Sequence, residues 1–122
     1  MNEIALNVPI LVLKDTIVVN LQFDLNDSLV ETLQDQVLEQ IERRNIAKLV
    51  INVSGLDVID SYLARMLVST LKMSSLMGVR SYLAGIRPYV ALTLVDMGLE
   101  RLHLFDVEIV SRVEDVVELS HG

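Results

Sequence analysis

The sequence predicts one α/β domain with a mixed central β-sheet, an N-terminal β-hairpin and crossover α-helices, in the order β-β-α-β-α-β-α-β-α. Three observations support this prediction. After two initial strands, short β-branched apolar runs alternate with longer amphipathic segments. Residues that favour turns or helix caps stand at most of the expected boundaries. The 122 residues show no repeat, low-complexity tract or linker, so we expect a single domain over residues 1–122.

The first two expected strands, residues 9–13 and 16–21, are β-branched and apolar. Lys14 and Asp15 lie between them and fit the turn of a hairpin. Because a hairpin pairs its strands antiparallel while crossover helices join parallel strands, the combination predicts a mixed sheet.

An amphipathic helix is expected next, ending near residues 43–45. Ser28 and Glu31 have the spacing of a capping box, which would start this helix. We expect its apolar stripe to contain Leu29, Val30, Leu33, Val37, Leu38 and Ile41. The opposite, polar face would contain Gln34, Asp35, Glu39 and Glu42.

Strand and helix then alternate along the chain. Residues 48–53 are nearly all apolar, as in a buried strand of a parallel or mixed sheet. A loop over residues 54–60 leads to a helix over residues 61–77, which Gly78 would end. Residues 79–84 form the next expected strand.

The last expected elements are a helix, a strand and a helix. Pro88 fits the first turn of a helix that continues to Asp96. A strand is expected near residues 105–110. Ser111 and Glu114 match a second capping box, which would open a final helix.

Composition and charge exclude several classes of protein. The net charge of −7 argues against binding nucleic acid or an anionic membrane, because both need a cationic surface. The chain has no cysteine, which excludes disulfides and thiolate metal sites. Its acidic first residues do not resemble a secretory signal, and no apolar run is long enough to span a bilayer. We therefore expect a cytoplasmic protein.

The residues offer little for catalysis or for a cofactor. The two histidines, His103 and His121, are far apart in sequence, and no catalytic triad, phosphate-binding glycine loop or metal-ligand spacing is present. Asp57 and Asp60 form a pair of carboxylates, but aspartate in turns and helix caps is usual. We therefore expect no enzyme, cofactor or metal site. A Mg²⁺-dependent phospho-aspartate receiver, with Asp57 or Asp60 as acceptor, remains an alternative.

Ser61 is the candidate site of regulation. Asp60 is the natural N-cap of the following helix, which makes Ser61 its first residue. A serine is tolerated there without any function. Alternatively, a phosphate on it would meet free backbone N–H groups and the positive end of the helix dipole. It would also add about −1.5 to −2 charges beside Asp57 and Asp60. The fold would survive, whereas a partner docked there would be repelled.

The helix that starts at Ser61 carries few charges for a surface helix. Arg65 and Lys72 are its only charged residues up to position 77. Sparse charge favours an outer face that is covered by a partner. The same helix carries a methionine stripe, which is more often part of a core: Met66, Met73 and Met77.

Residues 50–61, VINVSGLDVIDS, resemble the phosphorylation loop of STAS domains, the sulphate transporter and anti-sigma factor antagonist family. The hairpin start and the segment from residue 85 to residue 98 resemble the same family, so the resemblance covers essentially the whole chain. It implies a STAS-like fold and places the family's phosphorylated serine at Ser61. Residues 72–79 and 85–88 resemble the branch of scaffold proteins that build stressosomes, whereas residues 62–65 depart from the small residues that follow the phosphorylated serine in simple anti-sigma factor antagonists.

This resemblance implies a non-catalytic scaffold in bacterial stress signalling and sigma factor regulation. It would form homo- and hetero-oligomers with RsbR-type STAS proteins, whose N-terminal sensory domain this chain is too short to contain. It would hold an RsbT-type switch kinase, release it once phosphorylated on Ser61, and be reset by a cognate serine phosphatase. Asp57, Asp60, Tyr62 and Arg65 would form the surface that faces the kinase. The alternative in this family is a stand-alone anti-sigma factor antagonist.

Overall fold

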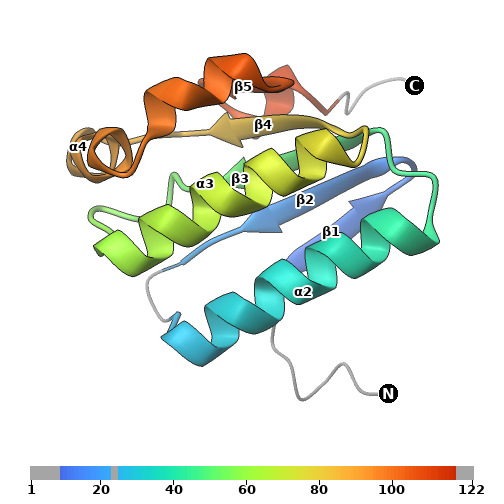
Figure 1. Ribbon diagram of the computed structural model, residues 1–122, viewed down its shortest axis with the longest axis horizontal. Coiled ribbons are helices and arrows are strands. Elements are labelled where there is room, and N and C mark those ends of the chain that lie inside the picture. The colour runs from blue at the N-terminus through green and yellow to red at the C-terminus, as the bar shows by residue number, and fades with distance from the viewer. Residues whose placement is uncertain (1–8, 23–24, 118–122) are drawn as a thin grey trace.

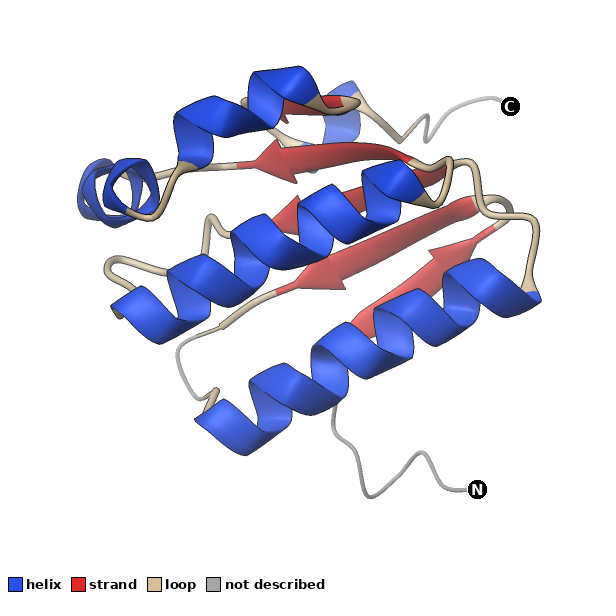
Figure 2. Cartoon of the chain, viewed as in Figure 1, coloured by secondary structure: helices blue, strands red, loops and turns tan. Residues whose placement is uncertain are grey.

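A five-stranded β-sheet forms the centre of the computed structural model, which describes residues 9–22 and 25–117 (Figures 1 and 2). The strands lie side by side in the order in which they occur along the chain. The first pair is antiparallel and the other three pairs are parallel, so the sheet is mixed as predicted. The strands are β1 (Ile10–Leu13), β2 (Thr16–Asn20), β3 (Lys48–Asn52), β4 (Arg80–Ala84) and β5 (Val107–Val110).

Three of the four helices expected from the sequence are present with at most small changes at their ends. The α-helices are α2 (Asp27–Arg43), α3 (Ser61–Leu76) and α4 (Pro88–Asp96). Two short 3₁₀ helices follow, η1 (Leu99–Leu104) and η2 (Val113–Asp115). Helix η1 was not predicted from the sequence; it begins directly after Gly98, a glycine with a φ of +97°.

All three α-helices lie on one face of the sheet, which gives the domain two layers (Figures 1 and 2). The cause is the strand order: each parallel strand is added on the same side of the previous one, and right-handed crossovers then place every helix on the same face. The main core lies between these layers and includes Ile17, Leu49, Leu71 and Leu83. On the opposite face a smaller cluster packs η2 against β3 and β4.

Helix α2 is capped differently from the prediction. The side chain of Asn26 accepts a hydrogen bond of 2.8 Å from the backbone N–H of Leu29, so Asn26 is the N-cap and the proposed Ser28–Glu31 capping box is wrong. The apolar stripe is confirmed, with Val30, Leu33, Val37 and Ile41 buried. Gln34 does not belong to the polar face, because its amide donates to Thr70 Oγ1 of α3 at 2.9 Å.

The second proposed capping box is also wrong. The backbone N–H of Arg112 donates to Asp115 Oδ2 at 3.2 Å, so the turn begins one residue later than Ser111 and Glu114 predicted. The expected final helix is only the three residues of η2 within the described part of the chain, and residues 118–122 lie outside it. Among the described helices, none is long and apolar enough to cross a membrane.

Candidate functional site

The loop between β3 and α3, residues 54–60, is anchored to the core by two of its apolar side chains. Leu56 is buried, and Ile59 packs against the main core. A backbone hydrogen bond of 3.0 Å from Leu56 to Val53 closes the first turn of the loop. The remaining side chains, including Asp57 and Val58, are exposed at the end of the sheet where the parallel strands finish. The loop is therefore held by its apolar side chains in the core, and its polar side chains point to solvent.

Gly85 allows this loop to approach the end of β4 closely. A Cβ atom at Gly85 would lie 2.7 Å from the Cβ of Ser54, which is closer than real Cβ atoms come, and 3.0 Å from Asn52 Oδ1, which is tighter than most real contacts. Its φ of +78° also favours glycine. Asn52 in turn accepts from the backbone N–H of Ser54 at 3.2 Å and donates to Asn20 Oδ1 at 2.9 Å. Three adjacent strand ends thus hold the start of the loop.

The start of α3 has the predicted geometry. Asp60 is the N-cap, and its carboxylate accepts a hydrogen bond of 2.8 Å from the backbone N–H of Leu63. Ser61 is the first residue of the helix and is exposed. Among the described residues, the backbone N–H groups of Ser61 and Tyr62 have no acceptor. A hydroxyl at this position is thus open to solvent beside unpaired donors, and the cap of the helix does not depend on it.

Two polar contacts join this end of α3 to neighbouring elements. Arg87, which precedes α4, forms an ion pair of 3.1 Å with Asp57 of the loop. The Tyr62 hydroxyl donates to Glu31 Oε2 of α2 at 2.8 Å. This hydrogen bond, helped by partial burial and by the negative charge of Glu31, raises the pKa of the Tyr62 phenol above its ordinary value.

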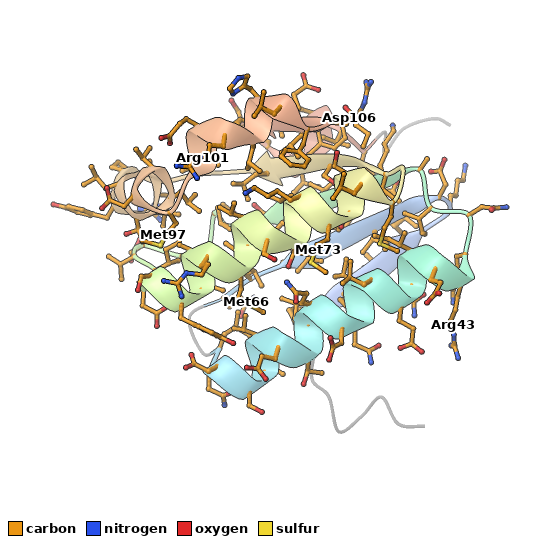
Figure 3. All side chains as sticks on the ribbon, viewed as in Figure 1. Arg43, Met66, Met73, Met97, Arg101 and Asp106 are labelled. Atoms are coloured by element: carbon orange, nitrogen blue, oxygen red, sulfur yellow. The ribbon has the colours of Figure 1, made fainter. Side chains whose placement is uncertain are left out.

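The polar residues of α3 and its methionines occupy different surroundings. Arg65 is exposed and lies one turn after Ser61, so the two residues share a side of the helix. The methionine stripe is divided. Met66 faces α2 (Figure 3) and packs on the core, whereas Met73 and Met77 are 37% and 44% exposed. The core interpretation of the stripe therefore holds for Met66 only.

The structure brings together most of the residues that the sequence singled out. Asp57, Asp60 and Ser61 lie at one end of the domain, with Arg65 beside them, whereas Tyr62 turns toward α2. Arg87 and Glu31 are neighbours of this site that were not predicted from the sequence. A signal for Arg87 was available, because the residues after β4 must lie at the same sheet edge as the residues after β3.

The two aspartates of the loop have structural partners, which limits the chemistry open to them. Asp57 pairs with a guanidinium, and Asp60 caps a helix. Over residues 9–22 and 25–117, no three acidic or histidine side chains are grouped so that they could hold a metal ion. The arrangement presents an exposed hydroxyl at a helix start among negative charges, which suits modification of the hydroxyl better than acid–base catalysis.

Comparison with protein families and curated sequences gives consistent results. The model of the STAS domain family matches residues 7–116. The RsbT co-antagonist protein RsbRB of Bacillus subtilis (strain 168) is 31% identical over 98 residues, which make up 80% of this chain and 35% of RsbRB. The chain thus spans about a third of the length of the curated relatives that it matches first.

Two solved structures resemble the chain over most of its length. A serine-to-glutamate variant of RsbS from Moorella thermoacetica has a TM-score of 0.78 and 32% identity, covering 88% of this chain and 89% of that one. A chain from a structure of the stressosome, described as a signal integration and transduction hub, has a TM-score of 0.74 and 33% identity. That match covers 87% of this chain and 90% of the other.

Proposed function

This chain belongs to the STAS domain family, and from that membership we propose that it is a non-catalytic scaffold subunit of a stressosome that releases a switch kinase when Ser61 is phosphorylated. The likeness to RsbS and to a stressosome chain supports the assembly. The likeness to RsbT co-antagonist proteins supports RsbR-type partners and an RsbT-type kinase. A cognate serine phosphatase would reverse the modification.

The observation that carries the switch is the position of Ser61. It is the first residue of α3 and is exposed, whereas the cap of the helix is supplied by Asp60. A phosphate on Ser61 would therefore leave the capping hydrogen bond in place. It would also lie near the positive end of the helix dipole, a favourable interaction of about 0.3–1 kcal/mol. The domain can accept the phosphate without unfolding.

The consequence for a bound kinase is different. A phosphate on Ser61 would add about −1.5 to −2 charges. Asp57, Asp60 and this phosphate would then lie within five consecutive residues of the chain. Like charges brought together at an interface cost several kcal/mol, so a kinase with acidic groups facing this surface would dissociate. We assign the kinase-facing surface to Asp57, Asp60, Tyr62 and Arg65, centred on the Ser61 hydroxyl.

The test uses an RsbT-type kinase bound to the full chain, with and without ATP. ATP should release the kinase from the wild-type protein and from Ser69→Ala, a control about two turns further along the same helix. The Ser61→Ala variant should keep the kinase bound. Mass spectrometry should find one phosphate, on Ser61. Equal release from the wild-type and Ser61→Ala proteins would rule out the switch, and phosphate on Asp57 or Asp60 would favour the receiver alternative.

A further inference from the structure

The outer face of α4 is apolar although it points away from the rest of the domain. Val90 and Leu94 on the inner side are fully buried in the core, and no residue from position 88 to position 95 carries a charge. The side chains on the outer side, at 67%, 63% and 52% exposure, are Tyr89, Leu92 and Val95. A helix that is apolar on all sides is usually buried on all sides, so this face is suited to a contact with another chain.

The position of α4 leaves that face open. Figure 1 shows α4 at one side of the helical layer, next to α3 and η1, with no described element beyond it. The outer sides of α2 and α3 do carry charges, such as Glu39 and Arg43 on α2 and Arg65 on α3. Among the α-helices that the structure describes, α4 alone presents an outer face without a charge between its first and last turns.

The two charges that flank α4 stand at the wrong ends for its own dipole. Arg87 is the N-cap residue, where the helix dipole is positive, and Asp96 is the last residue, where it is negative. Arg87 has one ion pair, with Asp57, which leaves other guanidinium N–H groups available. Asp96 is exposed and forms no ion pair with any residue in the described part of the chain. A second helix packed antiparallel would place its negative C-terminal end beside Arg87 and its positive N-terminal end beside Asp96, so both charges would be stabilised.

We propose that α4 is the contact between two copies of this chain, packed antiparallel about a two-fold axis close to Leu92. This arrangement places Arg87 of each copy beside Asp96 of the other, so two equivalent ion pairs flank an apolar centre. Tyr89, Leu92 and Val95 of both copies fill that centre. The antiparallel helix dipoles also attract each other.

Net charge favours a second copy at this surface over other parts of the domain. A chain of net charge −7 repels its own copies unless the surfaces in contact are neutral or complementary. The α4 face meets that condition, because it is uncharged at its centre and carries one charge of each sign at its ends. This contact does not require Ser61 to be phosphorylated, so it can be tested separately from the proposed switch.

The first experiment measures self-association of the full chain by sedimentation velocity over a range of concentrations. The Leu92→Asp variant should dissociate at least about tenfold more readily than the wild-type protein, because it buries two charges at the two-fold axis. The matched control is Leu76→Asp, since Leu76 is 75% exposed but lies at the far end of α3. A wild-type protein that stays monomeric, or a dimer that is unchanged by Leu92→Asp, would overturn the proposal.

A second experiment tests the antiparallel arrangement by cross-linking. Because the chain has no cysteine, a single introduced thiol reports one contact. Leu92→Cys should form a disulfide-linked dimer under mild oxidation, since residue 92 of each copy lies near the axis, whereas Leu76→Cys should not. In a background of Asp57→Asn, which removes the carboxylate that pairs with Arg87 within the chain, Asp96→Arg should weaken the dimer and the added change Arg87→Asp should restore it. Failure of this restoration, or equal cross-linking at positions 76 and 92, would rule out the antiparallel contact.

Discussion

The ion pair between Asp57 and Arg87 joins two surfaces of opposite character. On the Asp57 side, the loop and the start of α3 expose carboxylates and a hydroxyl. Asn52 holds the backbone at Ser54, Arg87 pairs with Asp57, and Asp60 caps α3. On the Arg87 side, α4 exposes a tyrosine, a leucine and a valine. The position of those side chains is set by the buried inner side of the same helix.

This difference explains how one small domain could carry both a switch and a lasting contact. A charge added at Ser61 acts strongly on polar groups nearby, but exposed charges are screened beyond about 8 Å at physiological ionic strength. The apolar centre of the proposed contact around Leu92 contains no charged side chain that such a charge would directly repel. Phosphorylation could therefore release one partner and leave another bound.

Replacing Gly85 with alanine should have the largest effect on the end of the domain that carries Ser61. The new Cβ would meet Ser54 at 2.7 Å and would sit at a positive φ, so we expect a loss of about 2–4 kcal/mol in the free energy of unfolding. Gly78→Ala is the matched control, because Gly78 also has a positive φ but has no atom within 4 Å of the added Cβ. It should cost about 1 kcal/mol. Urea denaturation measures both, and equal losses would show that the loop is not held tightly.

Replacing Asp60 with alanine should cost about 1 kcal/mol of unfolding free energy, because the N–H of Leu63 would lose its capping acceptor. Asp60→Asn keeps a side-chain oxygen and should cost only a few tenths of a kcal/mol. Amide hydrogen exchange in the first turn of α3 should accelerate in the alanine variant alone. An identical loss in both variants would mean that the charge of Asp60, and not its hydrogen bond, stabilises the helix.

The hydrogen bond between Tyr62 and Glu31 should give a small effect that depends on pH. Because the pKa of Tyr62 is raised in the folded protein, its contribution to stability is complete below the unfolded pKa of about 10 and is lost as the pH rises through the folded value. The stability difference between wild type and Tyr62→Phe should therefore shrink in that range. Absorbance titration should show one phenol ionising at lower pH in Glu31→Ala. No change in that variant would assign the shift to another cause.

The sequence was sufficient to predict the fold because its signals are local and agree with each other. The hairpin, the strand and helix alternation, the start of α3 and its cap at Asp60 are all confirmed. Each depends on periodicity or on a residue with a strong conformational preference. The position of Ser61 at the first turn of α3 followed from the same reasoning, whereas its role as a phosphorylation site stays a prediction.

Two kinds of feature could not be predicted from the sequence: the choice between neighbouring residues that can each cap a helix, and contacts between residues far apart in the chain. Asn26, Ser28 and Ser111 are all residues that favour N-caps, and spacing alone did not show which of them would cap a helix. The ion pair of Arg87 with Asp57 and the hydrogen bond of Tyr62 with Glu31 join residues about 30 positions apart. Their side chains meet only because parallel strands bring their following segments to one edge of the sheet.

The order of the strands also bears on how the protein is made. Each strand pairs with the one synthesised before it, and equivalent positions of β2, β3 and β4 are separated by 32 residues at each step. A chain that emerges from the ribosome could therefore add one strand and its covering helix at a time, without inserting a strand between two already paired. Until β5 arrives, the open edge of β4 is the growing point of the sheet. During translation that edge is where premature association between nascent chains would begin.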